Sequence, residues 1–167
     1  QLMNLNPDYT FANFVVGSGT DMAFAAATAV ARSPGSHFNP LFIHGATGQG
    51  KTHLLQAIGT ASMAARPGQT ALYMSAERFM YEFVSAMRAR ETLAFKARLR
   101  SASLLMIDDV QFIAGKEGTQ EEFFHTFNDL YEAGRQIVIT SDKSPALIQH
   151  LEERLRTRFE WGMIADI

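Results

Sequence analysis

The chain has 167 residues, of which 47% are hydrophobic and 19% are charged, and it contains no cysteine. This composition is typical of one globular domain with a real core, and it excludes disulfides and thiolate metal sites. The net charge of −2 provides no general attraction to nucleic acid, so a DNA contact would need a local basic patch.

Apolar runs that favour strands alternate with helical stretches along the chain. Residues 22–31 form the longest apolar stretch and predict a first helix after Asp21. This stretch is shorter than the roughly 20 residues that span a membrane, and no secretory signal is visible before it. The further elements expected in chain order are a loop at 33–40, a strand at 41–44, a helix at 51–64, a strand at 70–74, a helix capped by Ser75, a helix at about 91–100, a strand at 104–108, a helix at 119–133 ending at Gly134, a strand at 136–140, short helices at 145–150 and 151–157, and a closing strand at 161–167.

The order of these elements predicts an α/β fold. Strands separated by helices are typical of βαβ units around a parallel sheet. The run at 104–108, LLMID, has no polar alternation, as expected for a strand that is buried on both faces.

A complete phosphate-binding loop follows the strand at 41–44. The pattern is Gly45-x-x-x-x-Gly50-Lys51-Thr52. Glycines at 48 and 50 let successive backbone N–H groups face one anion, and the following helix adds its positive end. Lys51 can reach the β- and γ-phosphates, and the Thr52 hydroxyl can ligate Mg²⁺. The alternative, a glycine-rich turn that binds nothing, is disfavoured by the strand before the motif and the helix after it.

Two carboxylates, Asp108 and Asp109, end the buried strand at 104–108. The carboxyl ends of parallel strands line the ligand crevice. Asp108 is therefore expected to hold Mg²⁺ through water, and Asp109 to position or activate a water beside the γ-phosphate. The alternative is an Asp pair that caps the next turn.

Polar residues also end the strand at 136–140. Ser141 and Asp142 should point at the same crevice, where they could sense the γ-phosphate. The alternative is an ordinary N-cap of the helical stretch that follows.

Arginines recur in the segment LEERLRTRF. Arg154 and Arg158 are four residues apart and share a helix face. The residues by themselves favour a solvated ion-pair face with the neighbouring glutamates, and the alternative is an arginine finger offered to a neighbour's phosphate.

With these motifs in place, the sequence resembles the DnaA family of bacterial replication initiators, specifically the large lobe of their AAA+ ATPase domain. The resemblance covers essentially the whole chain. Its most specific part is IDDVQFIAGKEGTQEEFFHTFN at 107–128. The other matching segments are LNPDYTFANFVVG at 5–17, FNPLFIHGATGQGKTHLLQAIG at 38–59, YMSAERFMYEFV at 73–84 and ITSDKSPALIQHLEERLRTRF at 139–159.

The resemblance implies a P-loop NTPase lobe at 1–167, with a parallel five-stranded sheet sandwiched by helices. Residues 1–17 would be an adenine-contacting linker and 38–167 the αβα core. The family's lid lobe and its helix-turn-helix domain have no counterpart in the sequence, so we interpret the chain as a piece of a longer protein.

The resemblance also implies a role for each site residue. ATP or ADP would be bound by Phe14, Val15, Val16, Gly17, Gly45, Gly48, Gln49, Gly50, Lys51, Thr52 and His53. Thr52 and Asp108 would hold Mg²⁺, Asp108 and Asp109 would form the Walker B pair, and Asp142 would be the first sensor. Arg158 would be the arginine finger, and Arg154 would support it.

The function implied is an ATP switch for head-to-tail assembly at a replication origin, reset by slow hydrolysis in the bacterial cytoplasm at the nucleoid. A replicative helicase or a regulatory AAA+ protein would be a further partner. Single-stranded DNA would contact Val84, Lys116 and Thr119 in the assembled state. Gly118 stands where many relatives carry an arginine, which removes one phosphate contact.

Three alternatives remain open. A DnaC-like helicase loader shares the AAA+ site, but LNPDYTFANFVVG before the first core strand argues against it. A metabolic P-loop kinase would need an acceptor pocket and a closing lid, and the sequence shows neither. A regulatory module could bind nucleotide without hydrolysing it.

Overall fold

A computed structural model describes residues 5–48 and 50–167 of the chain. The strands are β1 Leu41–His44, β2 Ala71–Ser75, β3 Leu104–Asp108, β4 Gln136–Ser141 and β5 Met163–Asp166. The α-helices are α1 Asp21–Arg32, α2 Lys51–Ala65, α3 Ala76–Arg88, α4 Thr92–Arg100, α5 Glu117–Glu132 and α6 Glu153–Phe159. Two short 3₁₀ helices are η1 Val110–Ile113 and η2 Pro145–Leu147.

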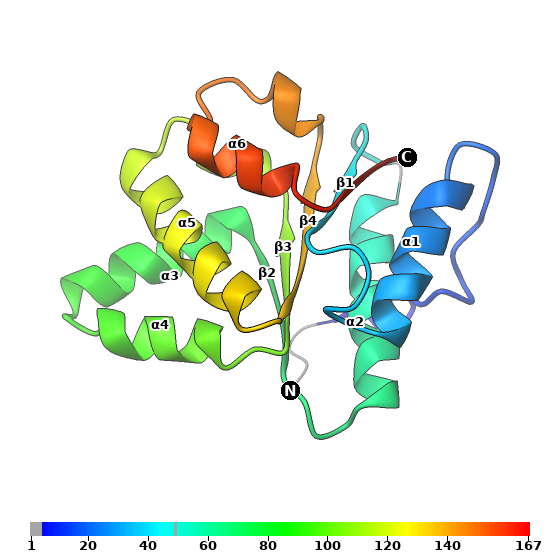
Figure 1. Ribbon diagram of the computed structural model, residues 1–167, viewed down its shortest axis with the longest axis horizontal. Coiled ribbons are helices and arrows are strands. Elements are labelled where there is room, and N and C mark those ends of the chain that lie inside the picture. The colour runs from blue at the N-terminus through cyan, green and yellow to red at the C-terminus, as the bar shows by residue number, and fades with distance from the viewer. Residues whose placement is uncertain (1–4, 49) are drawn as a thin grey trace.

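The five strands form one sheet in the order β2-β3-β4-β1-β5, and every pairing in it is parallel. Helices α1 and α2 cover one face, and α3, α4, α5 and α6 cover the other (Figure 1). The predicted parallel five-stranded α/β sandwich is therefore confirmed. Helix α1 belongs to the same layer as α2, so the αβα core includes it in addition to 38–167.

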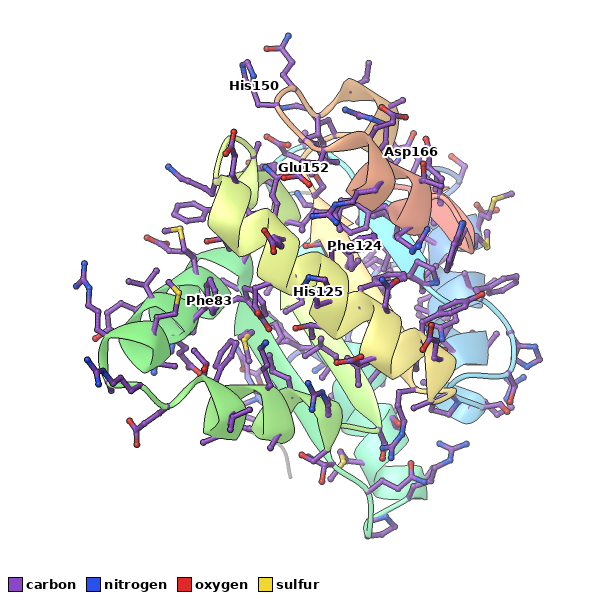
Figure 2. The ribbon with its side chains drawn as sticks, turned by 60° about the vertical axis from the view of Figure 1, so that its left-hand side comes forward. Phe83, Phe124, His125, His150, Glu152 and Asp166 are labelled. Carbon is purple, nitrogen blue, oxygen red and sulfur yellow. The ribbon has the colours of Figure 1, made fainter. Side chains whose placement is uncertain are left out.

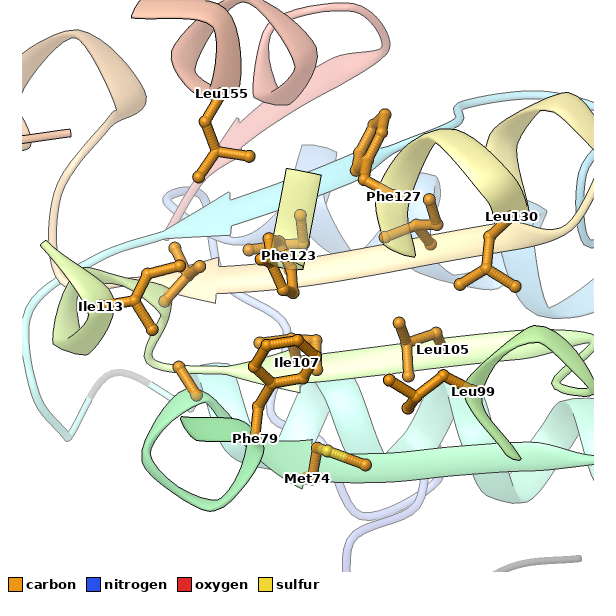
Figure 3. Packing of buried hydrophobic residues seen from close by; sticks show 14 of the residues in the cluster. Met74, Phe79, Leu99, Leu105, Ile107, Ile113, Phe123, Phe127, Leu130 and Leu155 are labelled. Atoms are coloured by element: carbon orange, nitrogen blue, oxygen red, sulfur yellow. The ribbon is translucent and has the colours of Figure 1, made fainter. Parts of the chain in front are cut away.

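Separate hydrophobic clusters fill the two sides of the sheet, because successive side chains of a strand point to opposite faces. On β3, Leu105 and Ile107 belong to the cluster under α3 to α6, while Leu104 and Met106 belong to the cluster under α1 and α2. Phe123 of α5 packs above the first pair (Figure 3). Burial of β3 on both faces explains its unbroken apolar sequence.

Local signals fix several boundaries. Ser75 caps α3, because its Oγ accepts a hydrogen bond of 3.0 Å from the backbone N–H of Arg78. Gly134 lies just after α5 with a φ of 74°, the left-handed conformation that commonly ends a helix.

The segment between β4 and α6 differs from the prediction of two consecutive helices at 145–150 and 151–157. Only the 3₁₀ turn η2 forms in the first part, and α6 begins two residues later than expected. The guanidinium of Arg156 donates to the carbonyl oxygens of Pro145, Ile148 and Leu151. These bonds satisfy backbone carbonyls that a continuous helix would have used, so the loop is stable without one.

Within residues 5–48 and 50–167, no helix is both long enough and apolar enough to cross a bilayer.

Candidate functional site

The P-loop joins β1 to α2 at the carboxyl edge of the sheet. Gly48 and Gly50 have φ values of 86° and 96°, a region that residues with a Cβ rarely adopt. The side chain of Lys51 is buried, and its Nζ donates to the carbonyl oxygens of Gly45 and Ala46 at 2.7 and 3.2 Å. The lysine therefore lies against its own loop, at the start of a helix whose positive end favours an anion.

Asp108 is the centre of a hydrogen-bond network at the end of β3. Its Oδ2 accepts from the hydroxyls of Thr52 at 2.8 Å and Tyr73 at 2.7 Å, and its Oδ1 accepts from Thr140. The Thr140 Oγ1 in turn accepts from the backbone N–H of Asp109 at 2.9 Å. Both oxygens of the buried carboxylate are thus fixed by α2, β2 and β4 together.

Tyr73 and Thr140 are site residues that the sequence interpretation missed. Burial, followed by the negative charge of Asp108, raises the pKa of Tyr73 well above its usual range. The phenol therefore stays protonated and remains a donor to Asp108. Both residues lie in apolar strands that flank the strand ending in Asp108. Their hydroxyl groups, in otherwise apolar strands, were the feature of the sequence that could have identified them.

Asp109 occupies the left-handed region, with a φ of 58°. Partial burial, followed by the charge of Asp108, raises the pKa of its carboxyl group, and a hydrogen bond from Gln111 opposes this shift. Gln111, also missed from the sequence, lies between the two strand ends. Its Nε2 is 3.5 Å from Asp109 Oδ1, and its Oε1 accepts from the Asp142 N–H at 3.3 Å.

Asp142 lies at the same sheet edge as Asp109. The strand end before it is tied to the P-loop, because the Gly45 N–H donates to the Ser141 carbonyl at 3.2 Å. The Asp142 Oδ1 lies 3.3 Å from Lys143 Nζ. The structure thus brings the sequence-predicted Lys51, Thr52, Asp108, Asp109 and Asp142 to one edge of the sheet. Gln49 lies outside the described residues.

The N-terminal segment lies against His53, at the start of the P-loop helix. Tyr9 stacks on His53 with ring centroids 4.9 Å apart, and the Thr10 carbonyl lies 2.7 Å from His53 Nε2. Phe14 is buried and meets the edge of the same imidazole at 5.2 Å. One pocket extends from this segment to the end of β3, lined by Tyr9, Thr47, Gly48, Gly50, Lys51, Thr52, His53 and Asp109.

Unlike the buried Phe14, the other residues of this segment that were predicted to contact adenine are exposed. Val15 is 88% exposed, and Val16 and Gly17 are also exposed. Tyr9, which the sequence interpretation did not select, takes the position beside His53.

Arg154 and Arg158 lie on α6, which covers the sheet face opposite α2. Arg154 forms the expected ion pair, with its Nε 3.0 Å from Glu152 Oε1. In residues 5–48 and 50–167 no ion pair involves Arg158, whose Nε instead donates to Asn128 Oδ1 at 2.9 Å. The ion-pair interpretation therefore describes Arg154 and not Arg158.

The residues predicted to contact DNA lie on or beside α3 and α5, which cover the sheet face opposite α2. Val84 is half-buried on α3, Lys116 is exposed before α5, and Thr119 is buried in the first turn of α5. A Cβ added at Gly118 would meet open space.

The donor atoms near the P-loop fit Mg²⁺. Thr52 Oγ1 and Asp108 Oδ2 are 2.8 Å apart, and both are hard oxygen donors. No group of three or more His, Asp or Glu in the part of the chain that the structure describes could hold a metal ion. A site with few protein ligands suits Mg²⁺, which keeps waters and phosphate oxygens around it.

Known proteins are similar to this chain over nearly its whole length. Residues 5–166 match the family model described as "Bacterial DnaA ATPAse domain". The chromosomal replication initiator protein DnaA of Zymomonas mobilis is 57% identical over 159 residues, which cover 95% of this chain and 33% of that protein. The chain thus spans about a third of the length of the curated relatives that it matches.

Solved structures give the same result. The crystal structure of domain III from the Thermotoga maritima replication initiation protein DnaA has a TM-score of 0.97 and 45% identity, covering 99% of this chain and 69% of that one. The structure titled "Replication initiator DnaA bound to AMPPCP and single-stranded DNA" has a TM-score of 0.94 and 42% identity, covering 99% of this chain and 51% of that one.

Proposed function

The chain belongs to the bacterial DnaA ATPase domain family, and from that premise we propose that it binds ATP or ADP with Mg²⁺ as the nucleotide switch of a replication initiator. The observation that carries the proposal is the bond network on Asp108. Thr52 from the P-loop helix and Thr140 from β4 donate to the two oxygens of one carboxylate. A ligand that binds Thr52 is therefore connected through Asp108 and Thr140 to β4, the strand that precedes Asp142.

Phosphate binding would use the backbone N–H groups around Gly48 and Gly50. Lys51 would exchange the carbonyl oxygens of Gly45 and Ala46 for the β- and γ-phosphates. This exchange is favourable, because a phosphate oxygen carries charge that a carbonyl oxygen lacks. The bound form of a relative, titled as a complex with AMPPCP, supports this use of the loop.

Mg²⁺ would be held by Thr52 directly and by Asp108 through water, and it would neutralise charge on the phosphates. Asp109 would then accept or orient a proton of the attacking water. Its place in the lining of the pocket beside Lys51 and Thr52 supports this role. Gln111 would link Asp109 to Asp142, the proposed first sensor.

Adenine would lie against the N-terminal segment. The pocket lined by Tyr9 and His53 supports this assignment. Phe14 of the same segment contacts His53, and the exposed Val15, Val16 and Gly17 follow it in the chain.

Assembly would be head-to-tail, with Arg158 of one subunit reaching the γ-phosphate held by the next and Arg154 supporting it. Placement of Arg158 on the face opposite α2 supports action in trans. A replicative helicase or a regulatory AAA+ protein is a further proposed partner, and the bacterial cytoplasm at the nucleoid is the proposed location. Single-stranded DNA would contact Val84, Lys116 and Thr119, supported by the relative whose title includes that ligand.

Titration of the chain with labelled ATP, ADP and AMP in Mg²⁺ tests the proposal. We expect ATP and ADP to bind about tenfold or more tightly than AMP, because AMP lacks the β-phosphate that receives charge-assisted hydrogen bonds. Equal affinity for all three would contradict the P-loop assignment. Binding without turnover by an assembled protein would instead favour the regulatory module.

Tyr73→Phe should weaken the affinity of the nucleotide site for Mg²⁺. Removing the hydroxyl frees one side of Asp108, and loss of such a supporting hydrogen bond costs about 10-fold or more in metal affinity. We expect the Mg²⁺ concentration for half-maximal ATP binding to rise by about that factor, with affinity in excess EDTA unchanged. The exposed Tyr81 provides the control variant Tyr81→Phe, and an unchanged Mg²⁺ titration for Tyr73→Phe would remove Tyr73 from the site.

Gly118→Arg should strengthen single-strand binding by a full-length initiator that carries this chain. Open space around Gly118 accommodates the side chain, and one added phosphate contact steepens the log–log salt slope by about 0.7. Gly68 also has open space around it and lies in the turn before β2, at the opposite sheet edge. Gly68→Arg is therefore the matched control. An identical slope for both variants would remove the Gly118 segment from the DNA path.

A further inference from the structure

Arg158 is held against two aromatic rings of its own subunit. Its guanidinium carbon lies 4.0 Å from the ring centroid of Trp161 and 5.0 Å from that of Phe124. Phe124 lies on the side of α5 that faces α6 (Figure 2). Cations are attracted to aromatic faces at such distances, and arginine also stacks on them.

Asn128 fixes the remaining orientation of the same guanidinium. Its Oδ1, one turn along α5 from Phe124, accepts from Arg158 Nε at 2.9 Å. The two rings lie within cation–π reach of the guanidinium, and Asn128 bonds one edge of it through Nε. In the part of the chain that the structure describes, no hydrogen bond or ion pair engages the two terminal Nη atoms of Arg158. The edge with two parallel donors, which suits bidentate recognition of phosphate, is thus left available.

Both rings are themselves firmly supported. Phe124 packs against the hydrophobic cluster under α3 to α6. Trp161 contacts Tyr131 at 4.9 Å between ring centroids. The turn after Trp161 is fixed to the residue before β1, because the Met163 N–H donates to the Pro40 carbonyl at 3.1 Å.

We propose that Phe124, Asn128 and Trp161 are positioning residues that preorganise Arg158 to meet the phosphate of the neighbouring subunit. An arginine free in solvent would lose many rotamers on binding, whereas one held on rings and an amide has lost them on folding. The inference rests on the proposed finger role of Arg158. The proposal also assigns a structural role to part of the EEFFHTFN segment, because Phe124 and Asn128 both belong to that segment.

Fluorescence of the chain in solution tests the stacking directly. Trp161 is the only tryptophan, so its emission reports on Arg158 without a label. We expect Arg158→Ala to shift the emission and to raise the acrylamide quenching constant about twofold, because the stacked cation no longer covers the indole. Arg154, which contacts Phe124 but has no contact of this kind with Trp161, provides the control Arg154→Ala. Identical emission and quenching of wild type and Arg158→Ala would overturn the inference.

Assembly of a full-length initiator that carries this chain tests the consequence. Trp161→Leu and Asn128→Leu should raise the protein concentration needed for ATP-dependent assembly by about three- to thirtyfold, with ATP affinity unchanged. Trp161→Phe and Asn128→Asp retain a ring and an acceptor and should recover most of the loss.

The outcomes separate the two ideas. If Arg158→Ala loses assembly while Trp161→Leu and Asn128→Leu assemble as wild type, the positioning inference is wrong and the finger role stands. If Arg158→Ala assembles normally, the proposed finger role fails and the inference fails with it. If the two leucine variants are defective and their conservative counterparts are equally defective, the effect is structural and the inference is overturned.

Discussion

Replacing Lys51 with alanine should weaken ATP binding by about 100-fold or more, because truncating one member of a buried, hydrogen-bonded charge pair costs several kcal/mol. Lys51 is the buried cation of the P-loop, and its Nζ is only 2.7 Å from a loop carbonyl. Among the described residues that line the pocket beside the loop, Lys51 is the only lysine, so the β- and γ-phosphates would lose their main counter-charge. Calorimetric titration of the chain with ATP in Mg²⁺ measures the loss.

Lys116→Ala is the matched control for this experiment. Lys116 is exposed before α5 and is assigned to DNA, so its removal should leave ATP affinity within about twofold of wild type. Thermal unfolding without nucleotide should show that both variants are folded. ATP affinity of Lys51→Ala equal to that of the control would refute the phosphate-loop assignment.

Replacing Arg158 with alanine should abolish ATP-dependent assembly of a full-length initiator while ATP binding by each subunit is retained. The guanidinium lies on α6 and α2 packs on the other sheet face, so its loss leaves the phosphate contacts of its own subunit intact. Where an arginine finger serves hydrolysis, its removal costs about 10³-fold or more in rate, and we expect ATP turnover by the variant to fall by a similar factor relative to the assembled wild type. Light scattering and phosphate release measure the two effects.

Mixing two defective variants separates action in trans from simple misfolding. Lys51→Ala retains Arg158 but lacks the ATP site, and Arg158→Ala retains the ATP site. Neither should assemble alone, whereas the mixture should form pairs in which one subunit supplies the arginine and the other supplies ATP. Absence of any recovery in the mixture would contradict action in trans, and normal assembly by Arg158→Ala alone would assign Arg158 to a local packing role.

The sequence predicted the sheet and most residues of the candidate site because both predictions depend on local patterns. Apolar runs such as 104–108 identify strands. The glycines and the lysine of the phosphate-binding motif at 45–52 all lie in one continuous segment, so their spacing can be recognised directly. Parallel order then places Asp108 and Asp142 at the same edge by topology alone. The short helices at 145–157 were placed less well, because Arg156 stabilises a loop there and its effect has no local signature.

Residues that act through distant contacts could not be found in this way. Tyr73 is 35 residues from Asp108 in sequence, and Arg158 is 30 residues from Asn128. Tyr9 reaches His53 across a loop, a helix and a strand. The sequence by itself determined the α/β class, the phosphate loop and the carboxylates that end β3, since backbone geometry and strand periodicity act over a few residues. Only the tertiary structure decided which hydroxyls hold Asp108 and which rings hold Arg158, because hydrogen bonds and aromatic contacts depend on distances that folding alone creates.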